Sequence, residues 1–225
     1  MYYTHERASV DIFGQQIFMK TILIYSGGMD STTLLYKLLA DGDQVQCLSF
    51  DYGQRHRKEL ACAKKICKRL NVPHKIVNIK SLKNLMSGSA LTSNIAVPEG
   101  HYKNKSMRQT VVPNRNMIFI SLAVAAAISK KFDRVALAVH SGDHVIYPDC
   151  RPDFIESIAK TVAFANYEKI DIYAPFLNIS KSEIAKLGLK LNVPFGETWT
   201  CYKGLSKPCG GCGACVERNE ALAKL

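Results

Sequence analysis

The sequence predicts an α/β protein built on a parallel β-sheet, and two observations support this prediction. Short apolar runs rich in β-branched residues recur along the chain, and helical patterns of roughly 10–18 residues separate them. Strands that alternate with helices are typical of a parallel sheet with helices on its faces. Such sheets bind ligands beyond the carboxyl ends of their strands, so we expect the functional motifs at those ends.

The first strand and first helix flank a pair of glycines. The run at 20–25 (KTILIY) is apolar and stops before Gly27 and Gly28, which predicts a buried strand. Leucines at helical spacing predict a helix at 31–40. Further strands are expected at 45–50, 75–79, 134–140 and 170–173, and further helices at 55–70, 114–131, 152–166 and 180–190.

Two local patterns mark helix ends. Ser180-Lys-Ser-Glu183 is a capping box and predicts that a helix begins there. The phrase Leu-Asn-Val-Pro occurs at 70–73 and at 191–194, each time after a helical pattern, and indicates a recurrent exit turn. Residues 81–113 show no clear period, and a loop of that length in a compact domain is usually functional or mobile.

Length and composition limit the class of protein. The 225 residues are 47% hydrophobic and 22% charged, which fits one globular domain with a small appended segment. We expect a leader at 1–18, an α/β domain at 19–195 and a cysteine-rich segment at 196–225. The leader lacks an apolar core, and the longest apolar run is shorter than the about 20 residues of a membrane span. We therefore expect a cytoplasmic protein without a membrane partner.

The net charge of +11 is concentrated in one part of the chain. Between Asp51 and Lys83 there are ten basic residues and two acidic ones. This excess fits three interpretations: an RNA-binding face, attraction of a polyanionic small molecule such as ATP, or a solvated helix face.

The string Ser26-Gly-Gly-Met-Asp-Ser-Thr-Thr33 follows the first predicted strand. Its glycines let backbone N–H groups at a helix N-terminus form an anion cradle, to which hydroxyl groups add donors. Asp30 would repel phosphates in such a cradle unless a cation such as Mg²⁺ joined them, so we infer a metal–pyrophosphate site. The alternative is a glycine turn in which Asp30 and Ser31 cap the helix.

Four cysteines lie within 15 residues near the end of the chain. Cys201, Cys209, Cys212 and Cys215 are separated by seven, two and two residues, with glycines between them. This spacing fits a structural tetrahedral Zn²⁺ site. An iron–sulfur cluster is the alternative, although the fourth cysteine of a ferredoxin-type run is absent.

Polar clusters follow the other predicted strands or open helices. They are Asp51-Tyr-Gly-Gln-Arg-His56, Pro113-Asn-Arg-Asn116, His140-Ser-Gly-Asp-His144 and Tyr147-Pro-Asp-Cys-Arg-Pro152. Arg115 can bind phosphate or carboxylate through two hydrogen bonds, and Asp143 and Asp149 can accept from a guanine-like base. For each cluster taken alone, a turn or a helix cap is an equally good interpretation.

These strings together resemble a known family. The Ser-Gly-Gly-x-Asp-Ser loop is similar to that of the N-type ATP pyrophosphatases, also called the PP-loop superfamily. With the other strings and the cysteines in this order, the chain from Met19 to Leu225 resembles the 7-cyano-7-deazaguanine synthases of queuosine biosynthesis. The resemblance implies an adenine nucleotide alpha hydrolase-like, Rossmann-like fold with a small zinc-binding segment at the C-terminus.

The resemblance also implies an activity: ATP-dependent ligation of ammonia to 7-carboxy-7-deazaguanine through adenylated intermediates, which gives the 7-cyano product. ATP, Mg²⁺ and Zn²⁺ are the expected cofactors, and the family suggests a homodimer without a stable nucleic-acid partner. No glutaminase domain is recognisable, so free or delivered ammonia is expected. The alternatives are a PP-loop tRNA sulfurtransferase and, from another class, a non-catalytic zinc-bearing RNA-binding module.

Site residues are assigned to four roles. The catalytic candidates are Ser26, Asp30, Arg115 and His56. The ATP loop comprises Tyr25, Ser26, Gly27, Gly28, Met29, Asp30, Ser31, Thr32, Thr33, Leu34 and Leu35. The substrate candidates are Asp51, Gln54, Arg55, Asn116, His140, Asp143, Asp149 and Arg151, and the metal ligands are Cys201, Cys209, Cys212 and Cys215. His56 or His140 could move protons, while a buried structural role is the alternative for His140.

Overall fold

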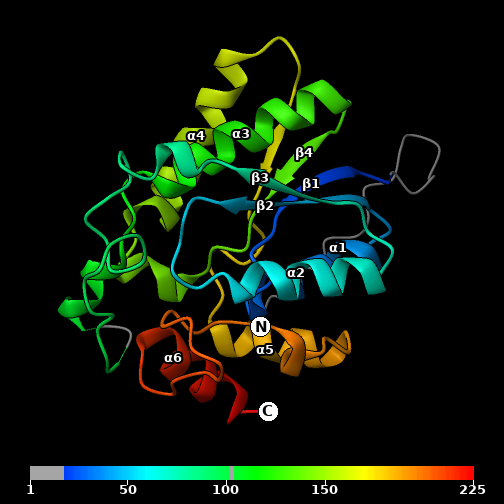
Figure 1. The fold of residues 1–225 in the computed structure, drawn as a ribbon. Helices are drawn as coiled ribbons and strands as arrows, with labels where there is room; N and C mark the ends of the chain where they lie inside the picture. Colours follow the sequence, from blue (N-terminus) through cyan, green and yellow to red (C-terminus); the bar gives the residue numbers. More distant parts are fainter. Residues whose placement is uncertain (1–17, 102–103) are drawn as a thin grey trace.

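The computed structural model describes residues 18–101 and 104–225, and its strands form one parallel sheet (Figure 1). The expected leader lies outside the described residues except for Phe18. The strands are β1 (Lys20–Ile24), β2 (Gln44–Asp51), β3 (His74–Asn78), β4 (Arg134–Ala136) and β5 (Asp171–Tyr173). Their order across the sheet is β3-β2-β1-β4-β5, so the direction of winding reverses at β1.

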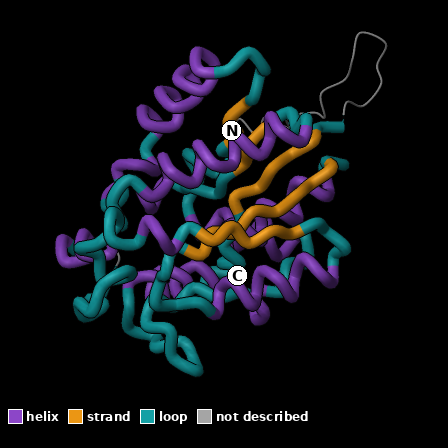
Figure 2. Tube along the Cα trace, turned by 45° about the horizontal axis from the view of Figure 1, so that its top comes forward, coloured by secondary structure: helices purple, strands orange, loops and turns teal. Residues whose placement is uncertain are grey.

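Helices cover both faces of the sheet. They are α1 (Met29–Ala40), α2 (Lys58–Arg69), α3 (Arg115–Lys130), α4 (Pro152–Ala165), α5 (Lys181–Lys190) and α6 (Gly213–Leu222). Figure 1 shows α3 and α4 above the sheet and α1, α2 and α5 below it, with α6 beside α5. The tube in Figure 2 shows the strands as a middle layer between these helices. The α/β prediction is therefore confirmed.

Alternation along each strand divides the core into two halves. In β1, Ile22 packs into the cluster with α3 and α4, whereas Leu23 packs into the cluster with α1, α2 and α5. Because successive side chains of a strand point to opposite faces, a strand that is covered on both sides is apolar throughout. This is why the uninterrupted apolar runs identified the central strands correctly.

Both Leu-Asn-Val-Pro phrases close a helix in the same way. Asn71 after α2 and Asn192 after α5 have φ angles of 53° and 58°, in the left-handed region. Asparagine tolerates this conformation better than most residues, so it terminates both helices. The capping box at Ser180 is also present, since its hydroxyl accepts from the N–H of Glu183. The predicted exit turns and helix start are confirmed.

Two predicted boundaries are wrong and one helix was not predicted. The strand expected at 134–140 ends at Ala136, because the following residues leave the sheet to line a cavity. The helix expected at 55–70 begins at Lys58, because the N–H of Arg55 is bonded to Leu91 O in the long segment. Helix α6 lies within the segment treated only as a cysteine cluster. The other elements agree to within two residues at each end.

The long segment 81–113 is part of the fold. It contains a 3₁₀ helix at Lys105–Thr110 and follows another at Lys80–Leu82. Met86, Leu91 and Met107 are at most 1% exposed and pack into the core beside α3. The described residues of this segment therefore form one side of the molecule. Among the helices of residues 18–101 and 104–225, none is long and apolar enough to cross a membrane.

Candidate functional site

A cavity of about 230 Å³ lies at the carboxyl ends of the strands, where the winding of the sheet reverses between β1 and β4. Loops after β1, β2 and β4, the start of α3 and the C-terminal segment all contribute to its wall. The sequence-predicted residues that line it are Tyr25, Ser26, Gly28, Met29, Asp30, Ser31, His56, Arg115, Asn116 and Asp143.

The loop after β1 has the geometry of an anion cradle. Gly27 has a φ of +81°, and a Cβ there would lie 2.4 Å from the carbonyl oxygen of Glu59, so only glycine fits. Gly28 is the N-cap residue of α1, so no side chain caps this helix. The N–H of Gly28 donates to Ser26 Oγ at 3.1 Å. Ser26 Oγ lies 3.0 Å from Ser31 Oγ. The N-terminus of α1 and these hydroxyls thus lie on the same side of the cavity and form part of its wall.

The Asp30 carboxylate lies in this cradle, at the second residue of α1. Its Oδ2 is 3.2 Å from Lys181 Nζ and 3.9 Å from His140 Nε2. Burial opposes its ionisation, but the charge of Lys181 outweighs that effect and lowers the pKa of Asp30. Its Oδ1 is buried and has no hydrogen-bond partner among the described residues. An ionised oxygen beside a phosphate cradle and without a partner fits a bound cation.

Lys181 was not predicted as a site residue. Its side chain is 9% exposed and its Nζ donates to Glu217 Oε2 at 2.7 Å in addition to its contact with Asp30. Although burial disfavours the ammonium, Asp30 and Glu217 raise the pKa of Lys181. A lysine in the first turn of a helix opposes the helix dipole. That conflict, inside the capping box, is the signal that could have identified it.

Arg115 and Asn116 begin α3 at the cavity wall. The Arg115 guanidinium lies 5.8 Å from the centroid of the Tyr147 ring. Asp149 does not line the cavity; its carboxylate accepts from the backbone N–H of Asn116 at 3.0 Å and so holds the start of this helix. Tyr52, Phe119, Tyr147 and Tyr202 complete an aromatic wall, and burial raises the pKa of Tyr52 to about 12.

The two candidate histidines differ in their surroundings. His56 is 3% exposed and lines the cavity, and its Nε2 lies 3.4 Å from Glu59 Oε2. Its Nδ1 is buried and has no hydrogen-bond partner within residues 18–101 and 104–225. His140 is 1% exposed and its Nδ1 accepts from the N–H of Gly142, so its Nε2 faces Asp30 and Asp143. His140 caps the 3₁₀ turn at Ser141–Val145 and does not line the cavity.

Several other predicted residues do not line the cavity. Asp51 pairs with Arg57 at 2.9 Å and Lys80 at 3.1 Å. Gln54 bonds to the backbone of Phe50 and Tyr52, Arg55 donates to Ala90 O and Ile95 O, and Arg151 donates to His144 O. These side chains hold loops in place. Within the ATP loop, Gly27, Thr32, Thr33, Leu34 and Leu35 also lie outside the lining, and the two leucines belong to the core.

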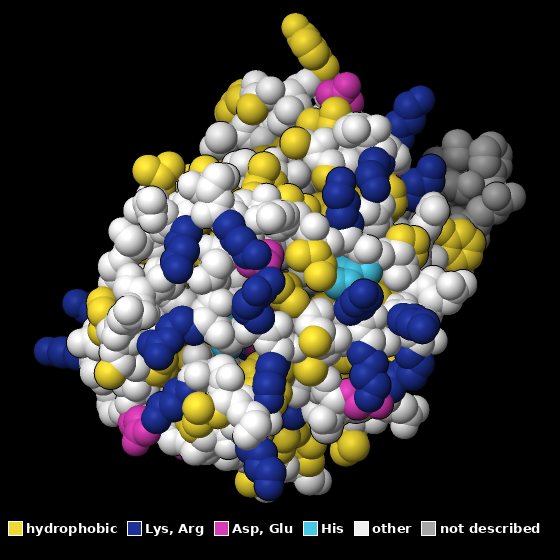
Figure 3. Space-filling model, in the orientation of Figure 1, with side chains coloured by type: hydrophobic (Ala, Val, Ile, Leu, Met, Phe, Trp, Pro, Cys, Tyr) yellow, Lys and Arg dark blue, Asp and Glu magenta, His cyan; other side chains and the backbone are white. Residues whose placement is uncertain are grey.

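Basic side chains are spread over the face of the molecule that Figure 3 shows. Several basic residues lie close to acidic ones. Lys65 and Arg69 lie 3.4 and 2.7 Å from Glu197, and Arg57 and Lys80 share Asp51. The basic stretch found in the sequence is therefore partly neutralised by acidic neighbours, as in a solvated surface.

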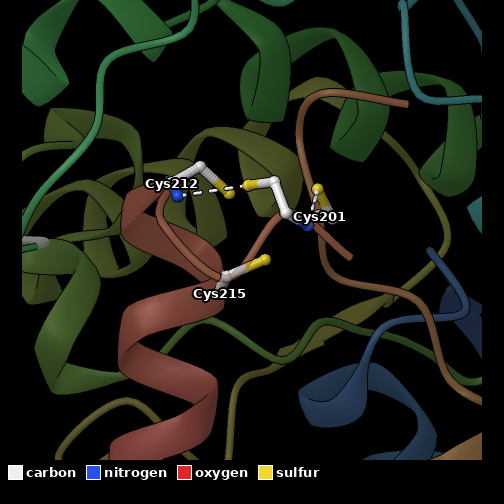
Figure 4. Close-up of side chains that lie close together, drawn as sticks. Cys201, Cys212 and Cys215 are labelled. Carbon is white, nitrogen blue, oxygen red and sulfur yellow. Dashed lines mark hydrogen bonds between the residues drawn. The ribbon is translucent and has the colours of Figure 1, made fainter. Parts of the chain in front are cut away.

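The four C-terminal cysteines converge on one point, as predicted. Their sulfurs all lie within 4.8 Å of one another, and Figure 4 shows three of them around the start of α6. A metal with bonds of about 2.3 Å to four sulfurs would place them about 3.8 Å apart, so these residues fit a tetrahedral metal. Burial disfavours the thiolate of Cys209, but N–H groups of Cys212 and Gly211 lower its pKa to about 7. The remaining cysteines lie elsewhere in the fold.

This parallel sheet, with a glycine-rich loop at its switch point, defines a nucleotide-binding protein of the adenine nucleotide alpha hydrolase-like class. The fold alone is also similar to that of the U34-tRNA thiolase NcsA from Methanococcus maripaludis, with a TM-score of 0.50 and 16% identity over 96% of this chain and 68% of that one. The model of the family described as queuosine biosynthesis protein QueC matches residues 20–225, and the chain belongs to this family.

Two relatives of this family illustrate the degree of similarity. The chain is 52% identical over 205 residues to the 7-cyano-7-deazaguanine synthase of Hahella chejuensis, covering 91% of this chain and 89% of the relative. It is 54% identical over 203 residues to the 7-cyano-7-deazaguanine synthase of Pseudoalteromonas translucida, covering 90% and 93%. The family resemblance inferred from the motifs is confirmed.

Proposed function

We propose that this chain is a carbon–nitrogen ligase that converts 7-carboxy-7-deazaguanine and ammonia to 7-cyano-7-deazaguanine with ATP, in queuosine biosynthesis. The relatives that carry the synthase name support the reaction. The observation in the structure that carries the proposal is the ionised Asp30, held in a phosphate cradle with its Oδ1 unpartnered. That arrangement serves a metal-bound pyrophosphate better than a simple helix cap.

The first step is transfer of AMP from ATP to the substrate carboxylate. Because a carboxylate is a poor electrophile, this transfer supplies a leaving group, and pyrophosphate departs. The N–H groups at the start of α1 and the hydroxyl of Ser26 stabilise the charge that develops on pyrophosphate. Arg115 is positioned at the wall to hold phosphates or the carboxylate. Mg²⁺ bound at Asp30 would neutralise part of the negative charge of the phosphates.

The second step is attack by ammonia, which displaces AMP and gives the amide. A second ATP transfers AMP to the amide oxygen and releases pyrophosphate, while the nitrogen loses a proton. Elimination of AMP with loss of the second N–H proton then gives the nitrile. His56 is the residue we assign to proton transfer, since its Nδ1 is free to accept and Glu59 holds its Nε2. The base of the substrate fits the aromatic wall, where Asn116 and Asp143 supply polar contacts.

The remaining assignments are also proposals. We assign Zn²⁺ to the four cysteines, because a closed shell of four thiolates is typical of structural zinc. We retain the division into an α/β domain at 19–195 and a zinc segment at 196–225, a cytoplasmic location and a homodimer. The sulfurtransferase and RNA-binding alternatives are not favoured, since the relatives at about half identity are named as synthases.

Release of AMP and pyrophosphate tests the proposal. Both products should form from Mg·ATP when 7-carboxy-7-deazaguanine and ammonium are present, and should fall to background when either is omitted. Asp30→Asn should abolish release, because the cradle then lacks its cation ligand. Release that is independent of substrate, or no release by metal-loaded protein, would contradict the proposed reaction.

A further inference from the structure

The four-cysteine centre and the cavity share a wall. Trp199, Thr200, Tyr202, Ala214 and Glu217 all line the cavity, and each is one or two residues from a cysteine of the centre. A metal site that served only to secure the end of the chain would not need to supply so much of the cavity wall. The contacts between this wall and the ATP loop run along two routes.

The first route passes through Trp199. Its indole Nε1 donates to the carbonyl oxygen of Cys201 at 3.0 Å, and its backbone N–H donates to Gly27 O in the ATP loop at 3.1 Å. A Cβ at Gly28 would lie 3.5 Å from Trp199 O, so the loop and this segment pass close to one another. The conformation at Cys201 is therefore transmitted to the glycines of the phosphate cradle.

The second route passes through α6. Cys212 caps this helix and Cys215 lies in its first turn, followed closely by Glu217. Glu217 Oε2 accepts from Lys181 at 2.7 Å, and Lys181 lies 3.2 Å from Asp30. A Cβ at Gly142 would lie 2.6 Å from Glu217 Oε1, which shows how closely this carboxylate is enclosed.

Arg218 joins the two routes. From α6 it donates to Thr198 Oγ1 at 2.7 Å, Thr200 Oγ1 at 3.1 Å and Phe195 O at 2.6 Å. The helix that carries Cys215 and is capped by Cys212 is thus bonded to the segment that carries Trp199. The stretch between Thr198 and Gly213 has no helix or strand of its own, so its shape depends on isolated contacts such as these and on any metal that its cysteines bind.

We infer that the four-cysteine centre positions the nucleotide site, with Trp199 and Glu217 as the positioning residues through which it acts. Metal bound by the cysteines fixes α6 and the 195–202 segment, and these fix the ATP loop and the Lys181–Asp30 pair. Metal occupancy and affinity for Mg·ATP are therefore coupled. The identity of the nucleotide rests on the proposed function, whereas the coupling rests on the contacts.

The only tryptophan of the chain, Trp199, makes this coupling measurable. Metal-free protein is prepared by chelation, checked for folding by far-UV circular dichroism, and reloaded with Zn²⁺. We expect the Trp199 emission to change on metal removal, and Mg·ATP affinity by calorimetry to fall about 5–150-fold, the usual range for coupled sites. Equal affinity in both folded forms overturns the inference. Failure of the metal-loaded protein to bind Mg·ATP contradicts the proposed function instead.

If the metal-free chain unfolds, metal-loaded variants of α6 test whether Glu217 positions the nucleotide site. Glu217→Gln keeps the shape of the side chain but removes its charge from Lys181. Glu220→Gln is the matched control, since Glu220 is 52% exposed on the same helix and faces His101 at 3.7 Å. With metal content unchanged in both, we expect Glu217→Gln to weaken Mg·ATP binding by about 5-fold or more and Glu220→Gln to leave it unchanged. Native affinity in Glu217→Gln overturns the inference.

Discussion

The ammonium group of Lys181 lies 3.2 Å from the carboxylate of Asp30, and this contact joins the start of α5 to the start of α1. Two helix N-termini would each favour an anion, so placing a lysine at one of them makes the pair electrostatically complementary. The contact keeps Asp30 ionised within a cradle built for phosphates. In the proposed reaction, the Lys181 ammonium would add a positive charge beside the departing pyrophosphate.

Replacing Lys181 should therefore slow the proposed transfer of AMP from ATP. Lys181→Met retains most of the side-chain length and removes the charge from Asp30 and Glu217. We expect kcat/KM for substrate-dependent pyrophosphate release to fall about 10²–10³-fold, as for loss of one electrostatic stabiliser of a transition state. Lys186→Met, an exposed lysine on the same helix, is the control. Native kinetics in Lys181→Met would exclude a role for this ammonium.

The metal content of the purified chain is a second prediction. Four thiolates in one cluster should hold one zinc ion per chain and no iron, as elemental analysis can measure. Cys212→Ser should lose the metal and lower the thermal unfolding midpoint, because metal binding contributes folding energy. Cys62→Ser, half-buried on α2, should retain both. A brown protein with stoichiometric iron would contradict the zinc assignment.

His74 should make stability depend on pH. The hydroxyl of Ser49 donates to Tyr25 O at 2.6 Å, so in its 2.7 Å contact with His74 it accepts from Nε2. Burial, with a smaller effect of Lys64, lowers the pKa of His74 below 6.5. The unfolded chain then binds the proton more tightly, and stability present above pH 6.5 is lost as pH falls through the folded value.

The check is urea unfolding between about pH 5 and 7. The free energy of unfolding of the native chain should fall more steeply on acidification than that of His74→Asn, which has no proton to gain. Parallel pH profiles for the two proteins would show that His74 does not cause the dependence.

A fourth prediction separates stability from function. Asp43 and Arg134 form a buried pair at 2.7 Å at the amino ends of the strands, where Thr21 also bonds to Asp43. Asp43→Ala should cost about 3–5 kcal/mol of unfolding free energy, because it leaves the largely buried Arg134 without a carboxylate. Glu156→Ala, which breaks a fully exposed pair with Lys160, should lower the free energy of unfolding far less, because solvent screens that pair. Mg·ATP affinity of folded Asp43→Ala should be native; a loss there would contradict this separation.

Much of the fold could be predicted because local patterns and global packing agree. The apolar run of β1 is buried on both faces, and the glycine loop after it falls at the switch point of the sheet. The ATP loop and the cysteine ligands could be located because each is a contiguous pattern. Asn71 and Asn192 also revealed their helix exits through sequence alone.

What could not be predicted depends on contacts between distant segments. The position of Lys181 in the capping box could have marked it as unusual, but its salt bridge could not be predicted, because Glu217 lies 36 positions away. Helix α6 starts among glycines and cysteines, which obscure a helical pattern. Asp51 is the last residue of β2 and Asp149 lies in a 3₁₀ turn at Pro148–Cys150. Their carboxylates accept hydrogen bonds from Arg57 and from the N–H of Asn116, and neither lines the cavity.

Formation of the nitrile is the most direct test of the central claim. Metal-loaded protein is incubated with Mg·ATP, 7-carboxy-7-deazaguanine and isotopically labelled ammonium, and the products are analysed by mass spectrometry. We predict 7-cyano-7-deazaguanine that carries the labelled nitrogen, with AMP and pyrophosphate formed alongside it, and none of these with Asp30→Asn. Consumption of ATP without labelled nitrile or amide would contradict the account.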